Sequence, residues 1–327
     1  MSNFIEQLHI KNFKSIKSSH IDGCKRINLF IGRPNVGKSN ILEALSVFSI
    51  PFLKENKSKS LTNLIRLENE TELFYSGNFD DFISIHSNIG NADLRYDKNQ
   101  GIEISIDTVN GGAEYLIDEK LNLRSRRRND DYDPIIKKYT FSIQTTFKRS
   151  HSRYLIPPFG YNLLNVIERN GELKDEVSNL FKDYNLSLVF DKASQSLKIL
   201  QPEKKDIFLI PYNSIADTLQ RIIFFKTAIA SNNNSILLFE EPEAHSFPPY
   251  ITHITQEMIY KKDNQFFIAT HSPFILNDLL ENARDELSVF VVDYKKNETK
   301  VKRLSDSELH EIYQNGVDLF TNNESYL

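Results

Sequence analysis

The sequence has almost no cysteine, which limits how the protein can be cross-linked. Its 327 residues include one cysteine, Cys24, and no tryptophan. A single cysteine excludes a disulfide within the chain and a zinc site built from several cysteines. Such sparing use of cysteine is typical of a reducing compartment. We therefore expect a cytoplasmic protein whose stability comes from its apolar core.

Long apolar runs are also missing. No stretch approaches the roughly 18 apolar residues that indicate a membrane-spanning helix. Residues 1–6 have neither the apolar centre nor the small-residue cleavage site of a secretory signal. The longest apolar runs, such as 236–239 and 290–292, are short and indicate buried strands. The sequence therefore predicts no contact with a membrane.

The sequence also lacks a strong excess of charge of one sign. Lys and Arg number 40 and Asp and Glu number 44, so the formal net charge is −4. The molecule as a whole does not attract nucleic acid, and DNA binding would need a local basic patch. Residues 124–128 are basic, but the acidic residues at 130, 131 and 133 favour a self-neutralising loop. A second stretch leaves the same two interpretations open and contains Lys148, Arg149, His151 and Arg153.

A glycine loop lies between a predicted strand and a predicted helix. Residues 32–39 read GRPNVGKS, after an apolar strand at 27–31 and before an apolar helix at 40–48. The two glycines allow backbone N–H groups to approach phosphate oxygens at the positive end of the helix. In this pattern the lysine neutralises phosphates and the serine hydroxyl binds Mg²⁺. We expect ATP and Mg²⁺ as cofactors, bound by Gly32, Asn35, Val36, Gly37, Lys38, Ser39 and Asn40.

Two adjacent carboxylates follow the apolar strand at 235–239. Glu240 and Glu241 would lie at the carboxyl end of this strand, where open α/β sheets bind ligands. We expect Glu240 to join Ser39 in holding Mg²⁺ or its water, and Glu241 to act as the general base toward the attacking water. The alternative, an acidic surface turn, is disfavoured by the phosphate loop in the same chain.

A histidine follows the next apolar strand, in the sequence FFIATHSP at 266–273. A lone histidine after a strand usually has a structural role. With the two preceding motifs, we expect His271 at the sheet edge, where it would bind a γ-phosphate oxygen or position the attacking water. The predicted catalytic residues are Lys38, Glu241 and His271.

Together these motifs resemble the SMC/RecF-like branch of ABC-type ATPases, close to stand-alone ATPases related to the OLD family. The resemblance rests on FKSI at 13–16, GRPNVGKSNILEAL at 32–45, SIADTLQR at 214–221, LLFEEPEAHSFPP at 237–249 and ATHSP at 269–273. Between these regions it is weak. It implies a homodimer around two ATP molecules, in which the signature segment of one subunit completes the site of the other. Ser214 is the candidate for that contact in trans.

The signature segment departs from the family pattern. An ABC signature carries glycine where the backbone approaches the γ-phosphate, whereas this chain has Ala216, Asp217 and Thr218. Asp217 would repel a phosphate unless it faces Mg²⁺, a ribose or a basic partner. The alternative is that 214–230 is only a packing helix. We cannot place a coupling glutamine, because Gln144 lies in a strand pattern.

The expected architecture is an α/β P-loop head of residues 1–327 without a coiled coil. Its core comprises 1–55, which starts with an edge strand at 4–13, and 205–327. An inserted lobe comprises 56–204. Short alternating segments in the lobe predict antiparallel strands, and helical spacing predicts one helix at 161–184. The strands are expected at 73–75, 82–85, 102–106, 115–117 and 139–143.

The favoured function is an ATP-driven dimer that acts on a separate effector. OLD-type relatives often carry a C-terminal nuclease, whose acidic cluster needs more residues than follow Pro273, so we expect any nuclease to be another protein. The resemblance also implies a role in bacterial anti-phage defence. The alternatives are a DNA-repair or chromosome-maintenance head that binds DNA, and a slow nucleotide-sensing module.

Overall fold

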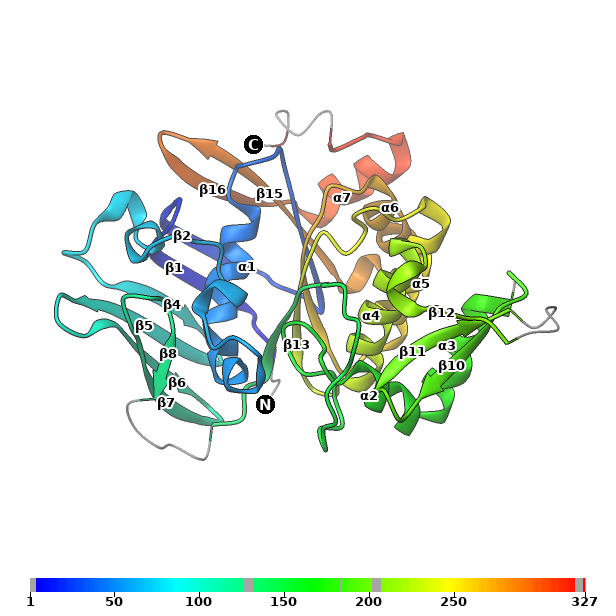
Figure 1. Ribbon diagram of the computed structural model, residues 1–327. Helices are drawn as coiled ribbons and strands as arrows, with labels where there is room; N and C mark the ends of the chain where they lie inside the picture. The colour runs from blue at the N-terminus through cyan, green and yellow to red at the C-terminus, as the bar shows by residue number, and fades with distance from the viewer. Residues whose placement is uncertain (1–3, 126–131, 183, 202–206, 321–325, 327) are drawn as a thin grey trace.

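The structure is a computed structural model that describes residues 4–125, 132–182, 184–201, 207–320 and 326. Two large β-sheets and one small sheet organise the described residues (Figure 1). The glycine loop, the adjacent carboxylates and the histidine all follow strands of one sheet, which we call the core sheet.

The core sheet has six strands, five of them parallel. Their order is β16 (Glu298–Arg303), β15 (Leu287–Lys295), β3 (Ile27–Ile31), β14 (Gln265–Ala269), β13 (Ile236–Glu240) and β9 (Ile136–Tyr139). Only β16 runs antiparallel to its neighbour. Strand β3 is buried along its whole length, as its apolar sequence predicts for a sheet covered on both faces.

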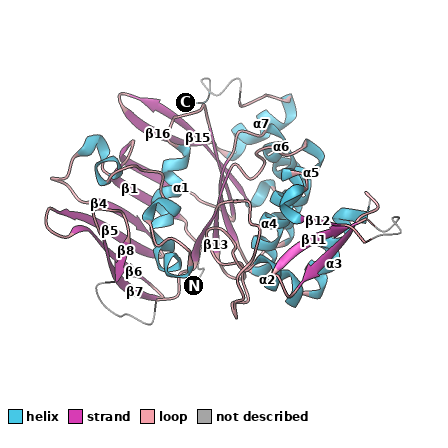
Figure 2. Cartoon of the chain, in the orientation of Figure 1, coloured by secondary structure: helices cyan, strands magenta, loops and turns pink. Residues whose placement is uncertain are grey.

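Helices cover both faces of the core sheet (Figure 2). On one face α1 (Lys38–Ser46) packs between the core sheet and the antiparallel sheet, and its apolar side chains join those of Phe30, Phe267 and Phe290. The other face carries Leu29, Ile268 and Val289, whose partners lie on the remaining helices. These are α2 (Leu163–Arg169), α3 (Gly171–Lys182), α4 (Asp217–Ser231), α5 (Pro248–Tyr260), α6 (Pro273–Asn282) and α7 (Asp306–Asn315).

The second large sheet is antiparallel and packs its apolar face on α1. Its order is β2 (Ile16–Asp22), β1 (Gln7–Phe13), β4 (Ile83–Ser87), β5 (Gly90–Asp97), β6 (Gly101–Thr108), β7 (Gly111–Ile117) and β8 (Leu123–Ser125). The expectation of an edge strand at 4–13 is wrong, because β1 pairs with both β2 and β4. The edge is β2, whose polar sequence KSSH concealed it.

Two further local predictions are wrong. Residues 73 and 75 lie in short 3₁₀ segments, η3 (Glu70–Leu73) and η4 (Tyr75–Gly77), and Phe74 between them forms only an isolated bridge to Phe13 instead of a strand. The predicted helix at 161–184 is divided into α2 and α3 at Asn170, whose side chain accepts a hydrogen bond from the N–H of Leu173. An Asn-Gly pair favours such a break.

Strand pairing crosses the boundary expected between core and lobe. Strands β1 and β2 join the antiparallel sheet, while β9 joins the core sheet beside β13. Strand β9 ends at Tyr139, so the predicted strand at 139–143 is displaced and Gln144 lies in a loop. A small sheet of β10 (Ser187–Asp191), β11 (Ser196–Leu200) and β12 (Leu209–Pro211) adjoins α3.

The remaining connections contain short 3₁₀ segments, namely η1 (Val47–Glu55), η2 (Leu61–Asn63), η5 (Tyr212–Ser214) and η6 (Arg284–Glu286). The longest helix in the described part of the chain is α4, with 15 residues. No coiled coil is present in these residues. None of the described helices combines the length and apolar character needed to cross a bilayer.

Candidate functional site

The glycine loop connects β3 to α1, and two of its positions accept only glycine. Gly32 has a φ of 151° and Gly37 a φ of 101°. A Cβ added at Gly32 would lie 2.2 Å from the carbonyl oxygen of Val292, and one at Gly37 would lie 2.1 Å from Oγ1 of Thr299. Side chains are therefore excluded both by conformation and by space.

Polar side chains from distant parts of the chain brace this loop from behind. Oγ1 of Thr299 donates to the carbonyl oxygen of Val36 at 2.9 Å and lies 2.6 Å from Oγ of Ser15. Nδ2 of Asn40 donates to the same Ser15 oxygen at 2.6 Å. The turn between β1 and β2 and the edge strand β16 thus fix the loop. Sequence reasoning missed Thr299, because it lies far along the chain in no motif.

A cavity of about 270 Å³ opens in front of the loop and brings three motifs together. It is lined by Pro34, Asn35, Gly37, Lys38, Ser39, Asn40, Arg66, Glu241, Ala269 and His271. The predicted residues Gly32 and Val36 shape the loop without lining the cavity. Glu240 and Ser214 also lie outside its wall.

Lys38 is buried and its ammonium group is held by the loop itself. Nζ donates to the carbonyl oxygens of Gly32 at 2.9 Å and Arg33 at 2.8 Å. Burial lowers the pKa of Lys38 to about 8, although nearby Glu241 and Glu240 oppose this shift. The positive charge is therefore poorly solvated and lies where an anion would stabilise it.

Glu241 and His271 face each other across the cavity. Oε1 of Glu241 lies 3.7 Å from Nε2 of His271, and both side chains are partly exposed. Burial and the charge of Lys38 lower the pKa of His271, against the opposing effect of Glu241. The imidazole is therefore neutral at neutral pH and can accept or donate a hydrogen bond, while Glu241 has a free carboxylate edge toward solvent.

Glu243 fixes the loop that carries His271. Its buried Oε1 accepts hydrogen bonds from Oγ1 of Thr270 at 2.7 Å and from the N–H of His271 at 2.9 Å. Burial raises the pKa of this carboxyl group. Among the described residues its Oε2 has no hydrogen-bond partner. Sequence reasoning assigned Glu243 no role, although an acid so close after two other carboxylates was a usable signal.

Arg66 connects the cavity to Glu240. Its guanidinium donates to Oε1 of Glu240 at 2.7 Å and to Oε1 of Glu43 at 3.0 Å. Nζ of Lys138 lies 3.9 Å from the other oxygen of Glu240. The predicted metal ligand Glu240 is thus paired with cations in this structure. Nothing in the sequence around Arg66 pointed to this position.

Glu43 is the centre of a buried ionic cluster beneath the cavity. Its side chain is fully buried, and Nζ of Lys14 lies 2.6 Å from it. Burial alone would raise the pKa of Glu43, but Lys138 and Lys14 hold it below its usual value. The cluster ties α1, β9 and the turn after β1 to the end of β13, and it includes Arg66.

A family model described as "AAA domain, putative AbiEii toxin, Type IV TA system" matches residues 27–277, which span the glycine loop, both carboxylates and His271. The chain belongs to this family. It is 22% identical over 297 residues to an ATP/GTP phosphatase of Helicobacter pylori, covering 73% of this chain and 76% of the relative. It is also 31% identical over 74 residues to the DNA replication and repair protein RecF of Streptococcus pneumoniae, covering 23% and 20% of the two chains.

Solved structures show the same fold. An SMC head bound to the C-terminal winged-helix domain of ScpA matches with a TM-score of 0.53 and 16% identity, over 92% of this chain and 98% of that one. An SMC head with an extended coiled coil, bound to the C-terminal domain of ScpA from Pyrococcus furiosus, gives 0.52 and 14%, over 95% and 99%. The prediction of an SMC/RecF-like ABC-type P-loop head is confirmed.

The signature segment of this ATPase head lies outside its own cavity. Ser214 ends η5 and is exposed. Asp217 begins α4 and pairs with Arg221 at 2.9 Å and with His245 at 3.5 Å, so its carboxylate has basic partners. Oγ1 of Thr218 donates to the carbonyl oxygen of His245 at 2.8 Å. The segment is thereby attached to the loop that follows Glu241.

The donors around the cavity fit Mg²⁺, which the P-loop family implies. Ser39 offers a hydroxyl oxygen and Glu241 a carboxylate oxygen at the cavity, both hard ligands, whereas Glu240 would have to exchange Arg66 for the ion. Among the described residues no group of three or more His, Cys, Asp and Glu side chains is arranged to hold a metal ion. Mg²⁺ takes few protein ligands and completes its shell with phosphate oxygens and water.

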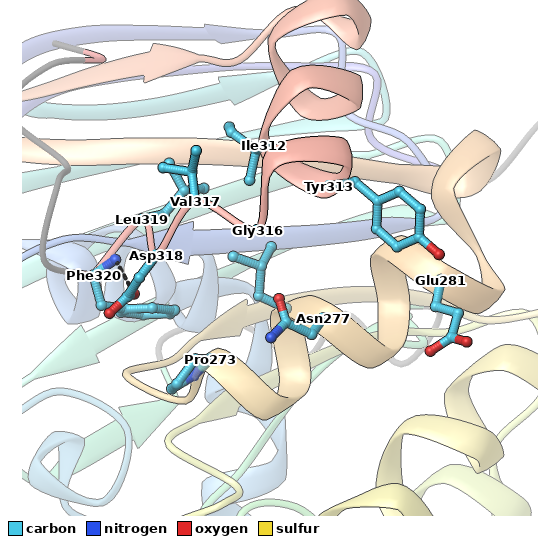
Figure 3. Close-up of a pocket in the computed structure, with 11 residues that line it drawn as sticks. Pro273, Asn277, Glu281, Ile312, Tyr313, Gly316, Val317, Asp318, Leu319 and Phe320 are labelled. Carbon is cyan, nitrogen blue, oxygen red and sulfur yellow. Dashed lines mark hydrogen bonds between the residues drawn. The ribbon is translucent and has the colours of Figure 1, made fainter.

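Another cavity, of about 260 Å³, lies between α6, α7 and residues 316–320 (Figure 3). Its wall includes the acids Glu281 and Asp318 but no Lys, Arg or His. A phosphate group would find no cation there. The cavity in front of the glycine loop, whose wall includes Lys38 and Arg66, is therefore the better candidate for a nucleotide site.

Proposed function

We propose that this head binds ATP with Mg²⁺ and hydrolyses it to ADP and phosphate. The observation that carries the proposal is the meeting of Lys38, Ser39, Glu241 and His271 in one cavity. The relative named ATP/GTP phosphatase, which aligns over most of both chains, supports it.

The chain's own groups divide the chemistry between them. Lys38 exchanges its two carbonyl partners for phosphate oxygens, and the N-terminus of α1 contributes backbone N–H groups. Ser39 and Glu240 hold Mg²⁺, which when bound neutralises charge on the phosphates. Glu241 accepts a proton from the attacking water, and neutral His271 orients that water or binds a γ-phosphate oxygen. Arg66 adds a positive charge to the cavity wall.

A second copy completes each site in this proposal. Ser214 is exposed and lies outside its own cavity, so it is available only to a partner. Large apolar side chains are exposed on elements that adjoin the cavity or the start of α4. They are Ile207 (82% exposed), Phe208 (59%), Phe247 (61%) and Phe274 (53%). If these side chains form one patch, it would suit a surface that another protein covers.

We further infer that residues 1–327 act as one head, whose nucleotide-driven closure is conveyed to a separate effector, with a nuclease as one candidate. Two SMC heads of the same fold are bound to ScpA domains, and the family description pairs a toxin with an antitoxin. A place in anti-phage defence, beside OLD-related ATPases, rests on the resemblance of the motifs alone.

Multiple-turnover phosphate release with purified protein, ATP and Mg²⁺ tests the central proposal. We expect many turnovers per chain, abolished by EDTA and by Glu241→Gln. Tight ATP binding with less than one turnover would instead identify a nucleotide-sensing module, an alternative that the unusual Asp217 segment favours.

A further inference from the structure

A basic segment that the ATPase site does not use lies between two cavities. Residues 149–151 line a cavity of about 330 Å³, together with Arg169 of α2 and Lys192 of the β10–β11 turn. Residues 150–154 line a second cavity, of about 510 Å³. The two cavities therefore share a wall made by Ser150 and His151.

Most of the cations here lack an acidic partner. The side chains of Arg153, Arg169 and His151 make no hydrogen bond or ion pair with any residue that the structure describes. Arg149 donates only to the carbonyl oxygen of Lys192, at 3.3 Å. Lys192 itself pairs with Glu168 at 2.6 Å. The guanidinium groups are thus exposed and available to an anion.

Two ammonium groups extend the same positive surface. Nζ of Lys57 and Nζ of Lys148 lie 5.2 and 5.3 Å from the centre of the Tyr161 ring. Nζ of Lys148 also donates to the backbone carbonyl of Glu55 at 3.3 Å. The carboxylates that line the two cavities are Glu55 and Glu168. Positive charges gathered in this way repel one another, which raises the electrostatic free energy of the surface. A bound polyanion would lower it.

The backbone of the segment is fixed to the core. The side chain of Asn162 accepts from the N–H of Ile156 at 2.8 Å and donates to the carbonyl of Tyr154 at 2.9 Å. The N–H of Leu155 donates to Oγ of Ser231, at the end of α4, at 3.0 Å. Oδ1 of Asn165 accepts from the N–H of Ser150 at 2.9 Å. The arginines therefore project from a constrained backbone.

We propose that this surface binds the sugar–phosphate backbone of a nucleic acid. We name it the basic cradle and define it by Lys57, Lys148, Arg149, Arg153, Arg169 and Lys192. Its cations come from separate elements and flank two successive cavities, so they can meet successive phosphates of one strand. Arginine, lysine, serine and asparagine side chains are the usual phosphate ligands in such interfaces. Binding is independent of base sequence and of ATP hydrolysis.

The test measures fluorescence anisotropy of labelled 30-mers with the full chain and no nucleotide. Single-stranded DNA, duplex DNA and RNA of one sequence are compared between about 50 and 200 mM salt. We expect at least one of the three to bind, with an affinity that falls steeply with salt. The double variant Arg149→Glu, Arg153→Glu should bind about tenfold or more weakly at low salt and show a shallower salt slope.

The matched control is Lys98→Glu with Lys120→Glu, which changes the net charge equally. Both lysines are exposed on hairpins of the antiparallel sheet. If the control binds the oligonucleotide as tightly as the parental protein, and both double variants unfold at the parental temperature, the loss of binding in the arginine variant is due to the basic cradle. Equal binding by both double variants, or no binding of any oligonucleotide at low salt, would overturn the proposal. So would poly-glutamate that competes as well as DNA, since the surface would then suit an acidic protein segment. Because nucleotide is omitted, none of these results depends on the ATPase proposal.

Discussion

Lys38 is a buried cation whose charge depends on pH within the range of ordinary assays. Burial lowers its pKa to about 8, so the free protein loses this charge as the pH rises through about 8. In the unfolded chain the group stays protonated up to its usual value. The native state therefore binds fewer protons between these limits, and Lys38 makes the free energy of unfolding increase with pH there.

Nucleotide affinity should fall as pH rises above about 8. Phosphates favour the ammonium form, so binding at pH 9 must return a proton to Lys38, whereas at pH 7 the proton is already present. Isothermal titration in buffers of different ionisation enthalpy should show proton uptake at pH 9 and almost none at pH 7. Lys38→Ala should weaken binding roughly 10- to 100-fold at pH 7, as expected for a lost charge-assisted bond, and abolish the uptake. Equal uptake by this variant would assign the titration to another group.

Glu241→Gln should separate binding from chemistry. The amide keeps the shape of the side chain but cannot accept the proton of the attacking water, so we expect turnover to fall about 100- to 10,000-fold. ATP affinity should change little, since Lys38 and the loop are untouched. Single-turnover phosphate release, with nucleotide binding measured in parallel, checks both statements. Parental turnover in this variant would place the base elsewhere.

At the scale of elements, the sequence predicted correctly the strands that end in a motif. It misplaced strands with polar sequences. Strand β3 spans the predicted residues 27–31, and β13 is shifted by one residue from the predicted 235–239. Strand β9 was displaced because its sequence, IKKY, contains two lysines, which sequence patterns assign to a surface. In the fold Lys137 is bound by Asn232 and Lys138 by the carbonyl of Leu64. Such partners are distant in sequence and leave no local signal.

Thr299 of edge strand β16 contacts Val36 of the glycine loop and Ser15, and a substitution there tests how much these contacts stabilise the fold. Thr299→Val keeps the volume of the side chain but removes the hydroxyl that bonds Val36 and contacts Ser15. Since the position is fully buried, we expect a loss of about 1–3 kcal/mol in the free energy of unfolding. Denaturant titration measures it, with Thr145→Val, at an exposed loop position, as the control. An equal, small effect of both changes would show that these contacts contribute nothing.

For the whole molecule, the sequence predicted which motif residues meet at the cavity better than it predicted the residues around them. Lys38, Ser39, Glu241 and His271 meet in one cavity as expected. Arg66 was missed, because its ionic contacts join a loop to one helix and one strand that are distant in sequence, and no sequence spacing marks such contacts. The family pattern also could not predict what the carboxylate of Asp217 faces. Its partners, Arg221 and His245, are identified only by the fold.

The dimer proposed here makes a prediction for the molecule as a whole. Glu241→Gln with ATP and Mg²⁺ should accumulate as a dimer, because hydrolysis no longer reopens it, and light scattering after gel filtration measures the mass. Adding Phe274→Asp should keep ATP binding but return the protein to a monomer, since this exposed ring begins α6 beside His271 and a buried carboxylate there would be costly. Tyr260→Asp, at an exposed ring at the C-terminal end of α5, is the control and should leave the dimer intact. A Glu241→Gln protein that stays monomeric while saturated with ATP would contradict an ATP site shared between two subunits. The proposed contact of Ser214 with the partner's site would then be wrong as well.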